Sequence, residues 1–214
     1  MTSLADTRRE YIHDSLSKKQ LNDNPFEQLK LWLEQAKQAE LKDATAMTLA
    51  TTGKDAMPDA RIVLLKDLSN AGLSWYTNYA SQKGQQLEEN AQACLLFYWR
   101  EFDRQVKIQG NVEKLAAGEA DSYFHSRPLD SQFSAAASQQ SQPINSRNAL
   151  QEKVDRLKKI DPDHVERPDS WGGYRLIPTG FEFWQGRENR LHDRFIYTCD
   201  ATAEKSWKIQ RLQP

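Results

Sequence analysis

Three nitrogen-bearing side chains lie close together near the end of the chain, in the segment 181–194 (FEFWQGRENRLHDR). They are Arg190, His192 and Arg194, and they follow Trp184 in an alternating apolar stretch. In an extended chain, side chains two residues apart share a face, so all three can point to one side. We therefore expect this segment to contribute to a site for an anion. The flanking arginines are expected to lower the pKa of His192 and to favour the neutral imidazole.

A second pair of cations lies in a strand predicted for residues 60–67 (ARIVLLKD). Arg61 and Lys66 are five positions apart, so in a regular strand they face opposite sides and could address two different anions. Two solvated charges at the ends of a strand are the ordinary alternative. A binding role gains weight because residues 62–65 are wholly apolar and are expected to be buried.

Residues 118–138 offer the chemistry of a phosphate site. Tyr123 and Arg127 are four residues apart, so they stack on one helix face if the last turn holds. Ser131 would lie at the N-terminus of the next helix, where free N–H groups favour anions. A phenol, a guanidinium fork and a hydroxyl suit a phosphate monoester, although an ordinary helix end has the same composition. Lys83, in the first turn of another helix, reads on its own as a surface charge.

Other polar residues are weaker candidates from spacing alone. Gln105 lies on an alternating strand, and Gln140 and Ser141 lie in a polar loop, where exposure to water is the ordinary interpretation. Trp184 is as compatible with the core as with a surface that contacts a ligand. His125 is expected to be structural or exposed.

The elements that position these residues follow from the periodicity of apolar residues. Helices are predicted after caps at Asn24, Ser81, Asp130 and Ser146, and over residues 118–126. Strands are predicted at residues 45–52, 60–67, 72–78, 91–99, 103–115, 173–178, 180–185, 194–199 and 206–212. The pattern indicates one α+β domain over residues 23–214, a barrel or roll of about eight mostly antiparallel strands with surrounding helices. Residues 1–22 are polar and are predicted to be flexible, with a possible role as a lid.

Composition narrows the functional classes. The chain has 214 residues and a net charge of −1, which argues against binding nucleic acid or anionic membranes by bulk charge. Its two cysteines form no metal or disulfide pattern, and no segment reads as a signal peptide or a membrane span. We therefore expect a cytoplasmic protein without a metal. Motifs for a dinucleotide or P-loop site are also missing.

The motifs do name a family when they are taken in order. They are RREY (8–11), ATAM (44–47), RIVLLKD (61–67), WYTN (75–78), RQVKIQG (104–110), YFHSRPLDSQ (123–132), QS (140–141), WGGYRL (171–176) and FEFWQGRENRLHDR (181–194). Together they resemble the pyridoxamine 5′-phosphate oxidase family over almost the whole chain. The blocks at 123–132 and 181–194 are the most specific ones. The resemblance implies an FMN-binding split barrel that acts as a homodimer, with FMN held between the subunits.

The resemblance also implies roles for individual residues. It assigns FMN to Arg61, Ile62, Val63, Leu64, Leu65, Lys66, Tyr76, Thr77, Gln82, Lys83, Gln105, Gln140, Ser141, Trp184 and Arg194. It assigns the substrate to Arg8, Arg9, Glu10, Tyr11, Lys66, Tyr123, Arg127, Ser131, Arg190, Leu191 and His192. Arg190 and His192 are the expected catalytic residues, and Asp43 is a weaker candidate for handling a proton. One departure is Gln82, where the family commonly has arginine; another is Ala44, where proline is usual.

The implied reaction is oxidation of pyridoxamine or pyridoxine 5′-phosphate to pyridoxal 5′-phosphate. Oxygen would be reduced to hydrogen peroxide, and ammonia would be released from the amine. Two alternatives remain open at this point. One is a flavin reductase of the same barrel class, and the other is a non-catalytic carrier of pyridoxal phosphate or flavin.

Overall fold

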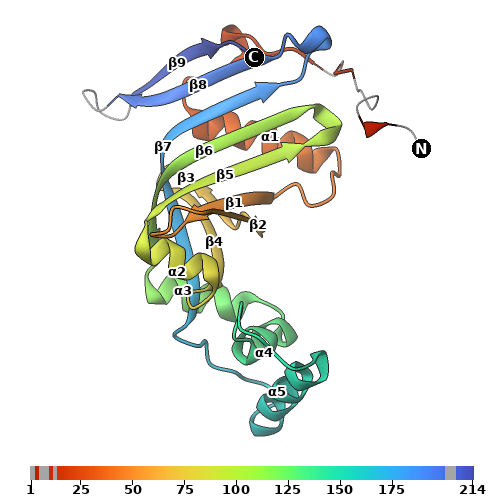
Figure 1. Ribbon diagram of the computed structural model, residues 1–214, viewed down its shortest axis with the longest axis vertical. Helices are drawn as coiled ribbons and strands as arrows, with labels where there is room; N and C mark the ends of the chain where they lie inside the picture. The colour runs from red at the N-terminus through yellow and green to blue at the C-terminus, as the bar shows by residue number, and fades with distance from the viewer. Residues whose placement is uncertain (1–2, 5–9, 12–13, 201–205) are drawn as a thin grey trace.

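The strands form one curled antiparallel sheet in the computed structural model, which describes residues 3–4, 10–11, 14–200 and 206–214 (Figure 1). The strands are β1 Ala46–Thr52, β2 Pro58–Leu64, β3 Asp67–Ser69, β4 Gly72–Asn78, β5 Gln92–Trp99, β6 Arg104–Lys114, β7 Trp171–Gln185, β8 Asp193–Asp200 and β9 Ser206–Leu212. Their order is β2-β1-β5-β6-β7-β4-β3, with β8 and β9 continuing from β7. The predicted α+β class and the curled, antiparallel sheet are confirmed.

Strand β7 organises the sheet, because it pairs with three other strands. It follows β6 along one edge, and its other edge pairs with β4 over Trp171–Leu176 and with β8 over Gly180–Gln185. Figure 1 shows it running along the length of the molecule. The sequence predicted two strands here, at 173–178 and 180–185. They are one strand, because the pairing with β6 continues past a bulge at Thr179. Opposite the bulge, a side chain on Gly110 would lie 2.1 Å from the carbonyl oxygen of Ile177.

The main core lies between one face of the sheet and helix α1, Pro25–Gln38. Asn24 caps this helix as predicted, because its side-chain oxygen accepts a hydrogen bond from the Phe26 N–H at 2.9 Å. The apolar stripe of the helix buries Leu29 and Trp32 against aromatic side chains from the sheet.

We expect Phe183→Ala to lower the free energy of unfolding by about 3–5 kcal/mol. Phe183 is fully buried, and its ring contacts Trp32 and Tyr197 with centroids 5.2 Å and 5.4 Å apart. Removing the ring leaves a cavity between a helix and a sheet that cannot both close on it. Urea denaturation measures the change, with the exposed Ile160→Ala as the control. A loss below 1 kcal/mol would contradict this description of the core.

The remaining helices gather near the far end of β7. They are α2 Gln82–Glu89, α3 Ala117–Ser126, α4 Leu129–Ala137 and α5 Arg147–Ile160. Phe124 from α3, Phe133 from α4 and Val154 from α5 pack with Trp171 in a second apolar cluster. Ser81 and Ser146 cap α2 and α5 through their hydroxyls, as predicted. This cluster holds α3 and α4 beside the first residues of β7.

Three local predictions need correction. The predicted strand 60–67 breaks at Leu65 and Lys66, where the Lys66 N–H turns to the Ser74 carbonyl, so Lys66 is not on the same strand as Arg61. Residues 62–65 are also not uniformly buried, because β2 is an edge strand and Ile62 is 65% exposed. Helix α4 begins after Pro128 rather than at a cap on Asp130, which lies in its first turn.

Candidate active site

A cavity of 790 Å³ lies between β2, β4 and the helices α2 and α4. Most of the residues predicted to bind phosphate or cofactor line it. The lining consists of Arg61, Ile62, Val63, Leu64, Lys66, Tyr76, Thr77, Asn78, Lys83, Tyr123, Arg127, Asp130, Ser131, Ser134, Ala135, Ser138, Gln140 and Trp171. Arg61 and Lys66 thus face the same cavity and do not face opposite sides, because the break after β2 redirects the chain.

Lys83 provides a buried cation at one end of this cavity. It is 7% exposed, and its Nζ has the neutral partners Thr77, Ser81 and Gln140 at 3.3–3.4 Å. Burial and, to a smaller degree, nearby Arg61 lower the pKa of the Lys83 ammonium. Among the described residues, no carboxylate forms an ion pair with it. Because all partners of this buried ammonium are neutral, its positive charge is not balanced and favours binding of an anion.

The polar loop that contains Gln140 and Ser141, which the family resemblance assigns to the cofactor, lies at the Lys83 end of the cavity. Gln140 Oε1 accepts hydrogen bonds from the Thr77 hydroxyl at 3.0 Å and from Lys83. Ser141 Oγ accepts from the backbone N–H of Gln82 at 3.2 Å, at the first residue of α2. Residues that are about sixty positions apart in sequence therefore meet at the N-terminus of a helix, where backbone N–H groups favour an anion.

Arg127 provides a second cation at the other end. Its Nη2 donates to the Ser131 carbonyl at 3.0 Å, and its guanidinium lies over the Trp171 ring, 5.0 Å from the centroid. Its Nη1 is buried and has no partner among the described residues. Burial lowers the pKa of Arg127, whose ordinary value leaves it charged all the same. Because buried N–H groups nearly always have a hydrogen-bond partner, the unpartnered Nη1 indicates a binding site for an acceptor.

Aromatic rings form the wall beside Arg127. Tyr76 and Tyr123 are stacked, with centroids 3.8 Å apart and planes 16° from parallel, and Trp171 continues the stack. Burial, followed by the charge of Glu119, raises the pKa of Tyr76, so its phenol remains a hydrogen-bond donor. The expected set of Tyr123, Arg127 and Ser131 lines this one cavity. The last helical turn does not hold, because α3 ends at Ser126 and Arg127 is extended, so Tyr123 and Arg127 do not share a helix face as predicted.

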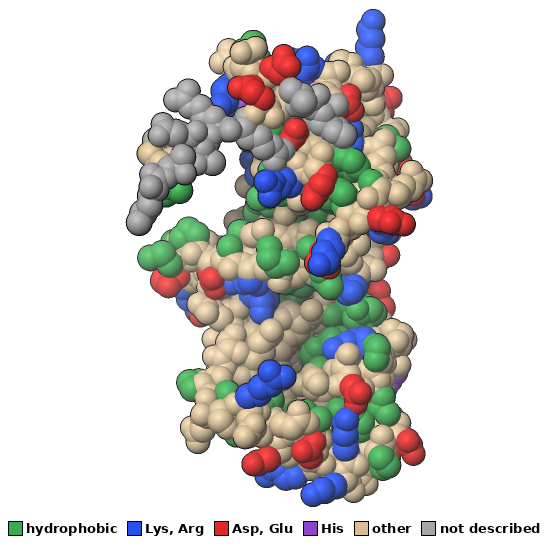
Figure 2. All heavy atoms as spheres, turned by 90° about the vertical axis from the view of Figure 1, so that its right-hand side faces the viewer, with side chains coloured by type: hydrophobic (Ala, Val, Ile, Leu, Met, Phe, Trp, Pro, Cys, Tyr) green, Lys and Arg blue, Asp and Glu red, His purple; other side chains and the backbone are tan. Residues whose placement is uncertain are grey.

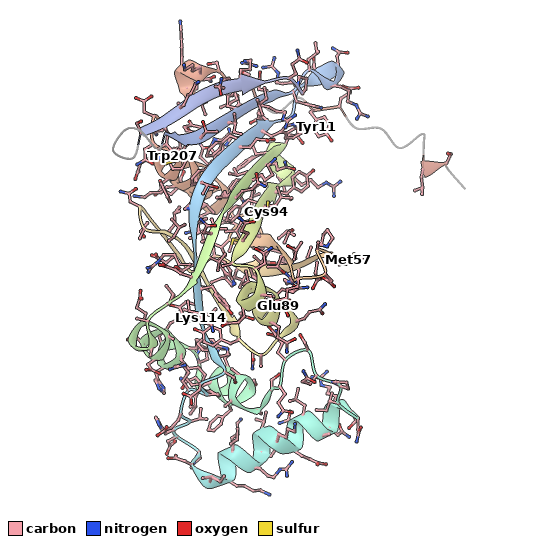
Figure 3. The ribbon with its side chains drawn as sticks, turned by 60° about the vertical axis from the view of Figure 1, so that its left-hand side comes forward. Tyr11, Met57, Glu89, Cys94, Lys114 and Trp207 are labelled. Atoms are coloured by element: carbon pink, nitrogen blue, oxygen red, sulfur yellow. The ribbon has the colours of Figure 1, made fainter. Side chains whose placement is uncertain are left out.

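The segment 181–194 lies elsewhere, at the opposite end of β7. Gln105, Trp184 and Arg194 are directly paired neighbours across β6, β7 and β8, so they share the sheet face that points away from the core. The His192 ring lies 4.7 Å from that of Trp184. Tyr11 packs edge-on against both rings at 5.7 Å and 5.3 Å, near the ends of these strands (Figure 3).

The predicted alignment of Arg190, His192 and Arg194 in one extended strand is wrong. Arg190 ends a short 3-10 turn, η4 Glu188–Arg190, and has a left-handed φ of 62°; β8 begins only at Asp193. Such a conformation is strained for arginine and is typical of functional sites. Arg190 and Leu191 are exposed, and Asp43 is exposed in a separate turn outside the cavity.

His192 is held in a defined tautomer. The backbone N–H of Arg187 donates to His192 Nδ1 at 3.0 Å, so Nδ1 is an acceptor and the proton of the neutral ring lies on Nε2. Burial lowers the pKa of His192, and the charge of Arg190 lowers it further, while Asp193 opposes this effect. The direction predicted from sequence is confirmed, with burial rather than the arginines as the main cause. His192 therefore presents an N–H donor.

The two groups of residues are far apart in one chain. Lys66 bonds to Ser74 on β4, which pairs with Arg175 on β7, whereas Arg194 pairs with Trp184. These two positions on β7 are nine residues apart, about 30 Å along the strand. Trp171 and Trp184 lie thirteen residues apart on β7, about 40 Å along the strand. A single chain therefore does not bring the cavity and the segment 181–194 to one ligand.

Part of the N-terminal segment is described. Leu16 and Leu21 are buried in the core, and the Leu16 N–H donates to Asp193 at 3.0 Å. Glu10 is exposed beside Tyr11, whereas Arg8 and Arg9 lie outside the described residues. The role of this segment as a lid stays a prediction.

Sequence reasoning missed Asn78, Asp130, Ser134, Ala135, Ser138 and Trp171 in the cavity. Trp171 and Asn78 stood in the quoted motifs WGGYRL and WYTN, and pairing across β4 and β7 places them opposite each other. On the face shown in Figure 2, charged side chains of both signs are interspersed. No described helix is long and apolar enough to cross a membrane.

Comparison with known proteins identifies the family of this chain. Residues 33–161 match the family model described as pyridoxamine 5′-phosphate oxidase, and residues 171–214 match the pyridoxine 5′-phosphate oxidase C-terminal dimerisation region. A protein of Burkholderia orbicola named pyridoxine/pyridoxamine 5′-phosphate oxidase is 49% identical over 214 residues, covering 100% of both chains. A protein of Trichormus variabilis with the same name is 47% identical and covers 99% of both chains.

Solved structures agree with these matches. The structure of PhzG from Burkholderia lata, in complex with tetrahydrophenazine-1-carboxylic acid, has a TM-score of 0.87 and 32% identity, covering 94% of this chain and 98% of that one. A pyridoxamine 5′-phosphate oxidase-related, FMN-binding protein from Nostoc punctiforme has a TM-score of 0.72 at 14% identity, covering 91% and 100%, which shows the fold alone. By its sequence and its fold, this chain belongs to the pyridoxamine 5′-phosphate oxidase family.

Proposed function

We propose that the protein is an FMN-dependent oxidase that converts pyridoxamine or pyridoxine 5′-phosphate to pyridoxal 5′-phosphate, in the biosynthesis and salvage of the vitamin B6 cofactor. Oxygen accepts the electrons and becomes hydrogen peroxide, and the amine substrate releases ammonia. The observation that carries the proposal is the pair of unmatched cations in one cavity. Lys83 has only neutral partners, and Arg127 has a buried N–H without one, so the cavity suits two phosphates.

The residues at the Lys83 end fit the phosphate of FMN. Lys83 and Arg61 supply positive charge, and the first turn of α2 supplies backbone N–H groups. Thr77 and Gln140 complete this end, and Ile62–Leu64 offer an edge strand for the flavin ring. Bound FMN would supply the redox chemistry, taking a hydride from the substrate and passing electrons to oxygen.

The residues at the Arg127 end fit the phosphate of the substrate. The guanidinium of Arg127, the hydroxyl of Ser131 and the phenol of Tyr123 are donors on one wall, and Lys66 adds a cation. Their role is to hold the pyridine ring at a fixed place relative to the cofactor, which is a proximity effect. Arg190 and the Nε2–H of His192 would orient the reacting carbon and stabilise charge that develops there.

We further propose that the working site forms between two copies of the chain. Trp184, Arg190 and His192 lie too far from the cavity of their own chain, and a partner copy can bring its set to this cavity. The match of residues 171–214 to a dimerisation region supports this arrangement. Exposed apolar side chains on β2 and β5, Ile62 and Tyr98, supply surface for such a contact.

One assay tests the proposed reaction. Purified, visibly yellow protein is given pyridoxamine 5′-phosphate in air, and hydrogen peroxide and pyridoxal 5′-phosphate are measured together. Equal, continuous release of both supports the oxidase. Bound flavin without peroxide release would favour a carrier, and bleaching by NADH without oxygen would favour a flavin reductase.

The likeness to PhzG favours a second candidate, oxidation of a tricyclic carboxylic acid related to tetrahydrophenazine-1-carboxylic acid. Two cationic ends in one cavity favour the phosphate substrate. Comparing the kcat/KM of the two substrates decides between them, because the tricyclic acid has no phosphate to meet Arg127.

Lys83→Met is expected to have opposite effects on cofactor binding and on stability. It removes a cation from the proposed FMN phosphate site, so the Kd of FMN should rise about tenfold or more. It also removes a buried charge, so the free energy of unfolding of the flavin-free protein should rise. Flavin fluorescence titration and urea denaturation measure the two effects, with the exposed Lys54→Met as the control. Unchanged FMN affinity would contradict the assignment of Lys83.

A further inference from the structure

The four terminal N–H groups of the Arg61 guanidinium are engaged by its own chain. Its Nη1 donates to the Leu49 carbonyl at 3.1 Å and to the Thr51 hydroxyl at 2.6 Å. Its Nη2 donates to Gln86 Oε1 at 3.3 Å and to the carboxylate of Asp59. Each η nitrogen of arginine carries two N–H groups, so all four already have protein partners. An anion that binds Arg61 through these groups must displace one of them.

Asp59 is the charged member of this set, and the strand places it there. Asp59 and Arg61 are two residues apart on β2, so their side chains lie on one face of the edge strand. The side chains are 31% and 18% exposed, so the ion pair is partly shielded from water. The other three partners are neutral oxygens that hold the guanidinium in position without competing for its charge.

The same carboxylate acts on the second cation of this end. Burial is the main cause of the lowered pKa of Lys83; the positive charge of Arg61 lowers this pKa further, whereas the negative charge of Asp59 raises it. All three groups therefore share one electrostatic environment. Two cations and one carboxylate leave a net charge of about +1 for a phosphate monoester that carries about −1.5 to −2. The phosphate must therefore approach a carboxylate as well as two cations.

We propose that Asp59 competes with the phosphate of the cofactor for Arg61, and that it thereby sets how tightly this protein binds FMN. The inference rests on the proposed function, in which that phosphate lies between Arg61 and Lys83. When FMN binds, Arg61 turns an Nη2 N–H from Asp59 to a phosphate oxygen, and the carboxylate is left beside a like charge. Asp59 stabilises the flavin-free protein and weakens the loaded one, so it determines affinity and takes no part in the reaction.

Titration of the flavin-free, full-length protein with two flavins tests the proposal. FMN carries the phosphate and riboflavin lacks it, and quenching of flavin fluorescence reports the binding of both. In Asp59→Asn the Kd of FMN should fall about tenfold, while the Kd of riboflavin stays within about twofold. Asp163→Asn removes the same charge at an exposed position outside the cavity, so it should change neither value.

Asp59→Ser gives a second reading if Asp59→Asn does not fold. The proposal is overturned if neither variant tightens FMN, or if riboflavin tightens as much as FMN, because the effect would then not involve the phosphate. A wild-type protein that binds riboflavin as tightly as FMN would instead refute the phosphate site itself, and with it the proposed role of Lys83 and Arg61.

Discussion

Replacing Arg127 with alanine is expected to raise the KM for pyridoxamine 5′-phosphate about 100-fold or more, with bound FMN unchanged. Arg127 supplies the guanidinium group at the substrate end of the cavity. Its Nη1 is buried without a partner among the described residues, while its Nη2 donates to the Ser131 carbonyl at 3.0 Å. Two charge-assisted hydrogen bonds to a phosphate would be lost together. Steady-state kinetics on yellow protein measures the effect.

The control for this prediction uses both a second substrate and a second variant. Pyridoxamine without its phosphate should react equally poorly with wild type and Arg127→Ala, because the missing contact is the phosphate contact. Arg156→Ala, on α5 and outside the cavity, should leave KM unchanged. An unchanged KM in Arg127→Ala would refute the assignment of the substrate phosphate to this end.

Replacing Arg190 with methionine is expected to lower kcat about 100-fold, with the Kd of FMN unchanged. Arg190 is exposed in its own chain, in a left-handed turn with φ of 62°, and it raises the local positive potential at His192. Strained backbone conformations are typical of functional sites, and a target on a second chain would explain why this strained arginine is exposed in its own chain. Methionine keeps the length of the side chain and removes the charge.

Arg187→Met is the matched control for Arg190→Met. Arg187 lies in the same connection between β7 and β8, but its Nη1 pairs with Asp193 at 3.4 Å. Its replacement should change kcat by no more than about threefold, the scale of a partly exposed ion pair. Equal losses in both variants would mean that the turn as a whole, rather than the Arg190 charge, matters. A normal kcat in Arg190→Met would remove it from the catalytic set.

Local features were predictable from the sequence because they depend on neighbouring residues. The caps at Asn24, Ser81 and Ser146 are side chains that bond to N–H groups two or three residues away. The cap at Ser81 also places Lys83 in the first turn of α2. The alternation of apolar residues likewise located β1, β4, β5 and β6 to within a few residues.

Features set by distant pairing were not predictable. Lys66 lies outside β2 because its N–H bonds to Ser74, and β7 continues past a bulge at Thr179 because it stays paired with β6 on both sides. The meeting of Gln140 with Lys83 spans a long stretch of sequence, and only the family resemblance pointed to it. The separation of the segment 181–194 from the cavity is a property of the whole sheet, which no local pattern contains.

A site shared between two chains is central to the proposed function, and a mixed dimer tests it directly. Arg127→Ala and Arg190→Met chains with different tags are co-expressed, and the heterodimer is purified through both tags. If Arg190 of one chain serves the Arg127 cavity of the other, one of the two sites combines both intact residues. With pyridoxamine 5′-phosphate held near the wild-type KM, the heterodimer should then recover about half of the wild-type rate, although each parent is nearly inactive at that concentration. A heterodimer as inactive as its parents would contradict the shared site.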